Sequence, residues 1–242
     1  MLVRIVNLDS SIERMKLIPA EMAKLGLGYE RFAAVDPFPG AGPWIGSSFT
    51  HSEALRGVSG LLMVCEDDVI FIDGAKEIFD KAFAQLPEDW DMFYLGANVK
   101  RPARRYSENL FRITYGVHCT HAIIYREKAR NFILENFSAL SGEIRAYDHW
   151  LFCEGQHRMN CYICYPLIAY QRPYYSNARK EYLDYLPEMK ENERKNLIKY
   201  LDDYSSCDII KYTCDDCQEQ CEFAFDKYNI DGNCLKIKKT QT

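Results

Sequence analysis

Residues 61–68 read Leu-Leu-Met-Val-Cys-Glu-Asp-Asp, an apolar run that stops at three consecutive carboxylates, Glu66, Asp67 and Asp68. A short apolar run of this kind is typical of a buried strand in a parallel sheet. Open α/β sheets bind ligands at the carboxyl ends of their strands, and Mg²⁺ sites use one or two carboxylates together with phosphate oxygens. The segment therefore suggests a metal-assisted nucleotide site; the alternative is that these carboxylates cap a turn or face water.

Segments of strand and helix character alternate on both sides of this run. Strands are predicted at 2–8, 29–35, 60–65, 92–95, 110–115, 121–125 and 160–165. Helices are predicted at 11–26, from Ser47 or Ser48 to Gly57, around 78–86, and at 127–136 and 147–155. This alternation predicts an α/β fold with a mainly parallel sheet. Residues 37–46 and the basic segment 97–109 are predicted loops.

The chain of 242 residues is long enough for one large α/β domain with an appendage. The alternation ends near Ser176, so we expect a domain at 1–176 and an extension at 177–242 that is helical at first and cysteine-rich at its end. The net charge of −5 gives no electrostatic case for nucleic acid. No segment resembles a signal peptide, and no apolar run approaches the roughly 20 residues of a membrane span. We therefore expect a cytoplasmic protein.

The ten cysteines fall into two groups. The first group lies in apolar sequence and is predicted to consist of buried, reduced thiols: Cys65, Cys119, Cys153, Cys161 and Cys164. The second group crowds the C-terminal extension: Cys207, Cys214, Cys217, Cys221 and Cys234. Its spacing leaves a structural Zn²⁺ site, reduced thiols and disulfides all open.

Short motifs also follow one another in a particular order. They are Ile5-Val6-Asn7-Leu8-Asp9 with Glu13-Arg14, Phe32-Ala33-Ala34-Val35-Asp36, Gly46-Ser47-Ser48-Phe49-Thr50-His51, Glu66-Asp67-Asp68, Leu86-Pro87-Glu88-Asp89-Trp90-Asp91 with Tyr94-Leu95-Gly96, Thr120-His121-Ala122, Ala146-Tyr147-Asp148-His149-Trp150-Leu151 and Tyr165-Pro166-Leu167 with Gln171. The ordered set, across about residues 1–176, resembles glycosyltransferase family 25, the lipooligosaccharide and collagen glycosyltransferases. Ser47, Thr50 and Ala146 differ from the residues usual in that family.

The resemblance implies a GT-A fold, which is Rossmann-like, and a nucleotide-sugar donor such as a UDP-hexose. It implies that Asp68, together with Glu66, binds Mn²⁺ or Mg²⁺, because a divalent cation stabilises the charge that develops on the departing diphosphate. Glu66 or Asp67 would otherwise contact the ribose or a metal-bound water. The remaining donor-binding residues would be Asn7, Leu8, Arg14, Asp36 and His51.

Two of these residues have structural alternatives. Arg14 either contacts the base of the donor or forms a surface ion pair with Glu13 or Asp9. His51 either bonds a donor phosphate or orients Asp68, or it is a buried structural histidine.

The family inverts the anomeric configuration, so one carboxylate must accept the proton of the attacking hydroxyl. Asp148 is the candidate base, with the alternative that it caps the helix that starts nearby. His121 is expected to be structural, and His149 and His157 are candidate additional metal ligands. The basic run from Lys100 to Arg105 is either a solvated loop or a clamp on the diphosphate or an anionic acceptor.

These observations predict a metal-dependent, inverting glycosyltransferase that moves a hexose, galactose or glucose, from its UDP form to a glycan or glycoprotein acceptor. One rival is a metal-dependent phosphoesterase, which would need a second cluster of His and Asp ligands. The other is a catalytically silent domain that binds nucleotides or glycans.

Overall fold

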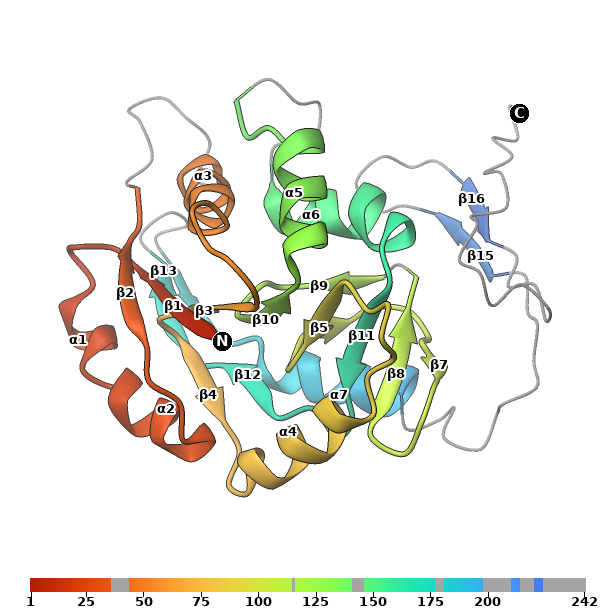
Figure 1. Ribbon diagram of the computed structural model, residues 1–242, viewed down its shortest axis with the longest axis horizontal. Coiled ribbons are helices and arrows are strands. Elements are labelled where there is room, and N and C mark those ends of the chain that lie inside the picture. Colours follow the sequence, from red (N-terminus) through yellow and green to blue (C-terminus); the bar gives the residue numbers. More distant parts are fainter. Residues whose placement is uncertain are drawn as a thin grey trace.

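The computed structural model describes residues 1–35, 44–114, 116–140, 146–176 and 181–197, and the backbone of residues 210–213 and 220–223. Its centre is an eight-stranded sheet (Figure 1). In spatial order the strands are β2 (Glu30–Ala33), β1 (Leu2–Asn7), β3 (Leu62–Glu66), β10 (Ala122–Tyr125), β5 (Met92–Tyr94), β11 (Cys161–Cys164), β8 (Leu110–Ile113) and β7 (Arg104–Arg105).

Most strands of this sheet run in one direction. β1 is parallel to both β2 and β3, and β11 is parallel to β5. β10 and β8 are antiparallel to the strands beside them, so β7 regains the common direction. The predicted α/β fold with a mainly parallel sheet is confirmed, and the carboxyl ends of β1, β2 and β3 meet at one edge.

Helices cover both faces of the sheet, which is why the central strand has no polar alternation. In β3, Leu62 and Val64 point into one core cluster, whereas Met63 and Cys65 point into the other. The second cluster also contains side chains of α2 (Ile18–Leu25) and α4 (Ala75–Ala84). The first includes side chains of α3 (Ile45–Ala54), α5 (Glu127–Asn136) and α6 (Tyr147–Trp150), which lie on the opposite side of the sheet (Figure 1).

Smaller elements complete the described part of the chain. Helical segments are α1 (Ile12–Met15), a π-helical turn at Leu151–Gly155, a 3₁₀ turn at Gln156–Arg158 and α7 (Leu186–Asn196). Four two-stranded pairs are β4 (Val69–Phe71) with β12 (Ala169–Gln171), β6 (Asn98–Val99) with β9 (Val117–His118), β13 (Tyr174–Ser176) with β14 (Glu181–Leu183), and β15 (Ile210–Thr213) with β16 (Gln220–Phe223).

Several predicted boundaries are wrong. The helix predicted at 11–26 is two helices, and Pro19 lies in the first turn of the second, where its missing N–H costs no helical hydrogen bond. The helix predicted to start at Ser47 or Ser48 starts at Ile45, and no side chain caps it. Ser48 lies inside this helix. The predicted loop at 97–109 contains the short strands β6 and β7.

The first cysteine group is present as free thiols, as predicted, although Cys119 and Cys153 are only partly buried. The second group lies outside the described residues, apart from the backbone of Cys221 in β16. None of the helices in the described part of the chain is long and apolar enough to cross a membrane.

The helix α7 packs against the same core as the sheet. Met189 is fully buried in the first core cluster. The buried carboxylate of Glu193 accepts hydrogen bonds from the Leu167 N–H, at 3.0 Å, and from the Tyr170 hydroxyl, at 2.7 Å. These contacts attach the helix to the segment that leads into β12. The division of the chain near residue 176 stays a prediction.

The substitution Glu193→Gln tests this attachment. The amide offers one acceptor oxygen in place of two, so one buried donor, Leu167 N–H or Tyr170 O–H, loses its partner. We expect the free energy of unfolding to fall by about 1–3 kcal/mol, measured by urea unfolding. Glu191→Gln, on the exposed side of the same helix, is the matched control, and equal unfolding midpoints for the two variants would contradict the expectation.

Candidate functional site

The carboxylate triplet lies where the carboxyl ends of β1 and β3 meet, as their parallel pairing requires. The side-chain amide of Asn7 donates a hydrogen bond of 2.6 Å to Asp67 Oδ2, and Arg14 Nη1 lies 3.0 Å from Asp67 Oδ1. Burial raises the pKa of Asp67, and the contacts with Asn7 and Arg14 oppose that rise. Because both oxygens are held by these two residues, Asp67 fixes the turn after β3 rather than facing open space.

The predicted alternative for Arg14, an ion pair with Glu13 or Asp9, is wrong. Its guanidinium pairs with Asp67 and lies 4.4 Å from the centre of the Tyr174 ring. A second bond, of 3.3 Å, runs from Arg14 to the carbonyl of Tyr175. Arg14 thus connects the triplet to β13 and borders a depression of about 410 Å³, whose lining is Ser10, Ser11, Ile12, Glu13, Arg14 and Tyr175. Leu8, half-buried, follows β1 on the way to this depression.

Asp68 is buried, with 3% of its surface exposed. Its Oδ1 atom has no hydrogen-bond partner among the described residues. Burial raises its pKa well above the ordinary value, and the charges of Glu66 and Asp67 raise it further. A buried carboxylate oxygen without a donor is costly, so this position favours either a proton or a cation.

The carboxylates at the end of β3 fit a divalent metal site with few protein ligands. In the described ranges no group of three or more His, Cys, Asp and Glu side chains is placed to hold an ion. A Mg²⁺-type site needs fewer protein ligands, because one or two carboxylates suffice when phosphate oxygens complete the shell. Asp68, with its unpartnered oxygen, and the adjacent Glu66 fit that smaller requirement. His149 and His157, the candidate additional ligands, do not line the cleft described below.

Glu66 is the member of the triplet that reaches open space, with 24% of its side chain exposed. Its Oε1 accepts a hydrogen bond of 2.7 Å from the Thr120 hydroxyl and lies 3.3 Å from His51 Nε2. Burial raises the pKa of Glu66, but hydrogen bonding and charge from His51, together with the Thr120 bond, lower it overall. These contacts keep Glu66 ionised and oriented.

One predicted partner of His51, Asp68, has to be revised, while the contact with a donor phosphate stays a prediction. His51 contacts Glu66 and Thr120, not Asp68, so the prediction that it orients Asp68 is wrong. Its ring is 2% exposed and stacks on the Tyr147 ring with centroids 5.2 Å apart. It therefore links the end of β3 to helix α6.

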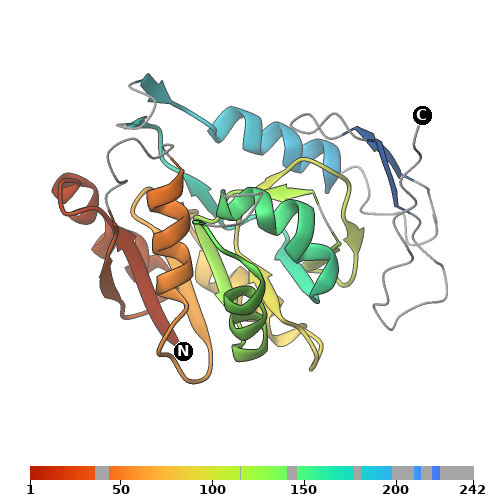
Figure 2. The same ribbon diagram turned by 90° about the horizontal axis from the view of Figure 1, so that it is seen from above.

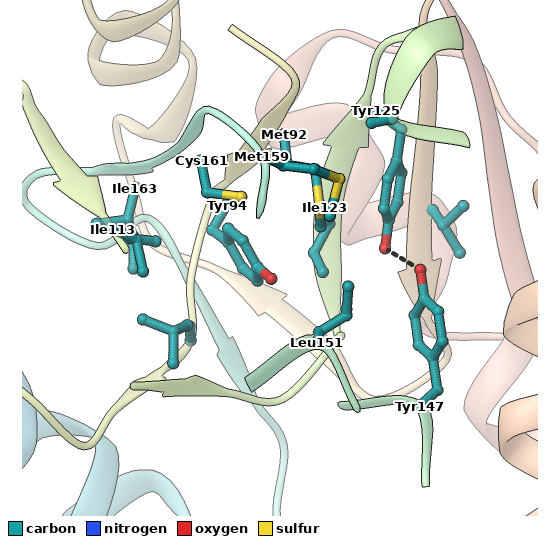
Figure 3. Close-up of a cluster of buried hydrophobic side chains, with 14 of the residues drawn as sticks. Met92, Tyr94, Ile113, Ile123, Tyr125, Tyr147, Leu151, Met159, Cys161 and Ile163 are labelled. Carbon is teal, nitrogen blue, oxygen red and sulfur yellow. Dashed lines mark hydrogen bonds between the residues drawn. The ribbon is translucent and has the colours of Figure 1, made fainter. Parts of the chain in front are cut away.

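Helix α6 carries Asp148, and Tyr147, the residue before Asp148, holds the helix in place. The Tyr147 hydroxyl donates a bond of 3.3 Å to the Tyr125 hydroxyl inside the core (Figure 3). The Tyr147 N–H donates to Ser48 Oγ, at 2.9 Å, which joins α6 to α3. The cap of α6 is Ala146, so the alternative that Asp148 is the N-cap is wrong.

The carboxylate of Asp148 is accessible, with 42% of its side chain exposed. Its Oδ1 accepts a bond of 2.8 Å from the His149 N–H, and its Oδ2 lies 3.7 Å from His118 Nδ1. Burial raises the pKa of Asp148, but the contacts with His118 and His149 outweigh this effect and lower it. Asp148 is therefore an ionised carboxylate in reach of a ligand.

Glu66 and Asp148 line the same cleft, which has a volume of about 460 Å³. Asp67 and Asp68, both buried, are not among the residues that line it. The full lining is Trp44, Ser47, Ser48, His51, Glu66, Asn98, Lys100, His118, Cys119, Thr120, Tyr147, Asp148, Gln171, Tyr174, Tyr185 and Glu188. The cleft thus joins the carboxyl end of β3, helix α6 and the start of α7.

Sequence reasoning did not find His118 and Cys119. His118 stacks on Phe152, with ring centroids 4.2 Å apart, and faces Asp148. Cys119 has a φ of 73°, which a non-glycine residue adopts only when its surroundings hold it there. Burial raises the pKa of its thiol, so it is no thiolate nucleophile. His118 lies in β9, and Cys119 directly follows this strand. A strand of two residues is too short to show an alternating pattern in the sequence.

The remaining predicted residues that the structure describes lie in the core, at the cleft and in β7. His121 is fully buried, and its Nε2 lies 3.2 Å from the carbonyl oxygen of Ala169. Gly96 allows this close approach, because a Cβ there would lie 1.7 Å from that oxygen. In the basic run, Lys100 lines the cleft and forms an ion pair with Glu188, whereas Arg104 and Arg105 form β7. Asp36 lies outside the described residues.

No protein-family model and no curated protein matches the chain. Solved structures with a similar arrangement include A197 from STIV, with 15% sequence identity, a TM-score of 0.44, and coverage of 76% of this chain and 93% of that chain. A glycosyltransferase involved in the glycosylation of the major capsid of PBCV-1 has 10% sequence identity and a TM-score of 0.39, with coverage of 64% of this chain and 75% of that chain. The catalytic domain of Drosophila beta1,4-galactosyltransferase 7, in complex with xylobiose, has 10% sequence identity and a TM-score of 0.44, with coverage of 88% of this chain and 86% of that chain. Likenesses this distant assign no activity.

Proposed function

We propose that the protein is a metal-dependent, inverting glycosyltransferase that uses a UDP-hexose donor. The observation that carries this proposal is the buried, unpartnered Oδ1 of Asp68 beside the partly exposed Glu66, at the carboxyl edge of a mainly parallel sheet. Ligands of open α/β sheets bind at that edge. The ordered motifs that resemble glycosyltransferase family 25, with its lipooligosaccharide and collagen acceptors, support the same reading.

In this proposal Asp68 and Glu66 would hold Mn²⁺ or Mg²⁺. The cation would supply Lewis-acid stabilisation of the departing diphosphate. Leu8 and Arg14 border the nucleoside, and Asn7 and Asp67 keep the two strand ends together beneath it. His51 and Thr120 hold Glu66 in its orientation, so the donor meets a carboxylate that is already placed.

Asp148 is proposed as the general base. The acceptor hydroxyl oxygen forms a bond to the anomeric carbon as the bond from that carbon to the phosphate oxygen breaks, and Asp148 takes the hydroxyl proton. The attack comes from the face opposite the diphosphate, which inverts the configuration. Asp148 and Glu66 line one cleft from different elements, as this arrangement requires.

The rival phosphoesterase would need a second cluster of His and Asp ligands, and the described part of the chain places none near the cleft. A silent binding domain would bind the donor without transfer, so it predicts the same ligand but no product. Activity on a bound donor separates these readings.

A panel of UDP, GDP, CMP and dTDP sugars, each with Mn²⁺ or with EDTA, tests the proposal by thermal unfolding. At 100 times its dissociation constant a ligand adds about 2.7 kcal/mol of stability, so a UDP-hexose with Mn²⁺ should raise the melting temperature by roughly 5–10 °C. The increase should vanish in EDTA. Stabilisation by no nucleotide sugar at any metal concentration would overturn the proposal.

A further inference from the structure

Helix α7 contributes to one wall of the cleft. It follows residue 176 in the chain, so the family resemblance does not cover it. Tyr185, which precedes its first turn, and Glu188, within that turn, both line the cleft. In Figure 2 the light-blue helix extends from the β13–β14 pair along the side of the molecule. These two residues therefore come from the part of the chain, after residue 176, that the resemblance does not cover.

The wall is firmly attached. The side-chain amide of Asn192 donates a bond of 2.7 Å to Asn98 Oδ1, and that of Asn196 donates a bond of 2.6 Å to the carbonyl of Val99. Glu193 and Met189 anchor the opposite side of the helix in the core. Glu188 is consequently presented from a fixed element rather than from a loop, as a site residue needs to be.

Glu188 neutralises the one lysine of the cleft. The Lys100 ammonium and the Glu188 carboxylate form an ion pair, and the pKa of Glu188 is lowered first by its hydrogen bond with Lys100. The other acidic side chains in the lining are Glu66 and Asp148, and no second lysine or arginine lines the cleft in the described part of the chain. The charge of the protein side chains that line the cleft is therefore net negative, and at the Lys100 and Glu188 end the carboxylate offsets the ammonium.

Aromatic rings also line the cleft, and Tyr185 is the one nearest to Glu188 in the sequence. Trp44 is 52% exposed and lines the cleft with Tyr174 and Tyr185. Sites for small ligands combine such apolar faces with a few placed polar groups. A neutral sugar presents both apolar C–H faces and hydroxyl groups, and its hydroxyls can bond to the ammonium and the carboxylate together, whereas an anionic sugar would face a net negative wall.

We propose that the part of the cleft formed by Lys100, Tyr185 and Glu188 is the acceptor subsite, and that α7 makes it selective for neutral glycans over anionic ones. This inference rests on the proposed glycosyl transfer. Glu188 is a specificity-determining residue here: by pairing with Lys100 it offsets the ammonium charge that would otherwise attract an anionic acceptor. An exposed ion pair contributes little to stability, so its removal reports on selectivity and not on folding.

The test compares p-nitrophenyl β-glucoside with p-nitrophenyl β-glucuronide as acceptors, since the two differ by one carboxylate. We expect wild-type kcat/KM to favour the glucoside by at least roughly tenfold. Glu188→Gln frees the Lys100 charge and should shift the ratio toward the glucuronide by about tenfold, mainly through KM. Lys100→Gln should shift it the other way, and Glu191→Gln, outside the cleft, should leave it unchanged.

Affinity for UDP with Mn²⁺, measured by calorimetry on the same proteins, distinguishes failure of the proposed function from failure of the acceptor assignment. Loss of UDP binding in the wild type would defeat the proposed function itself. If UDP binds but the glucuronide is the better wild-type acceptor, or neither acceptor is used, or Glu188→Gln leaves the ratio unchanged, the acceptor assignment alone is overturned.

Discussion

Replacing Asp148 with Asn should reduce sugar transfer by at least about 10²-fold, the lower end of what a general base contributes, while nucleotide affinity stays near that of the wild type. The amide keeps the size of the side chain and can still accept the 2.8 Å bond from the His149 N–H. It cannot take a proton from the acceptor hydroxyl. The loss should therefore appear in kcat and kcat/KM alike, because the interaction is made only in the transition state.

The pH dependence gives a second measurement on the same residue. Contacts with His118 and His149 lower the pKa of Asp148 from its ordinary value of 3.8 despite burial, so the base stays ionised above that value. The acidic limb of kcat/KM that belongs to Asp148 should accordingly lie below pH 3.8. Glu154→Gln, an exposed carboxylate in the next helical turn, is the matched control. Wild-type transfer rates in Asp148→Asn would assign the base to another residue.

The substitution Asp68→Asn should have opposite effects on binding and on stability. Loss of a group that only supports a metal ligand costs 10–100-fold in metal affinity, so loss of the ligand itself should weaken metal-dependent UDP binding by at least roughly 100-fold. The metal-free protein should become more stable, by roughly 1 kcal/mol, because the buried carboxylate has no donor for Oδ1 and lies beside two further charges. Urea unfolding without metal measures the second effect.

The sign follows from the pKa of Asp68. That pKa is raised in the folded state, so the ionised carboxylate opposes folding at neutral pH. In the metal-free wild type this cost should decline as the pH falls through the folded pKa toward the ordinary value of 3.8, and Asp68→Asn should lack the corresponding part of the pH dependence. Asp73→Asn, an exposed carboxylate after β4, is the control. A variant that is less stable than the wild type but binds UDP with Mn²⁺ normally would refute both parts.

The sequence around the triplet predicts the centre of the fold well, because the pattern that determines it lies within a few consecutive residues. Residues 61–65 are apolar on both faces, which only a strand covered by helices on both sides can satisfy, and β3 has that environment. The parallel pairing of β1 with β3 then follows from the alternation of strands and helices, and it brings Asn7 against Asp67. These features depend on patterns of several residues.

The rest of the site depends on contacts that no local pattern encodes. His51 reaches Glu66, and His118 reaches Asp148, across large sequence separations, and β9, which carries His118, is too short to show a period. The contribution of α7 to the cleft was missed because exposed charged residues dominate its composition, whereas few of its side chains, among them Leu186, Met189 and Glu193, face the core. Sequence reasoning therefore found the carboxylates and named Asn7, Arg14 and His51 as site residues, but it did not find their contacts with Asp67 and Glu66, and it missed His118.

Calorimetric titration of UDP into the wild-type protein, first with Mn²⁺ and then with EDTA, measures whether the protein binds a nucleotide through a divalent cation, as proposed for Asp68 and Glu66. We predict one binding site per chain in Mn²⁺ and no measurable binding in EDTA. Equal UDP binding with and without the metal, or no binding of UDP in the presence of Mn²⁺, would contradict it.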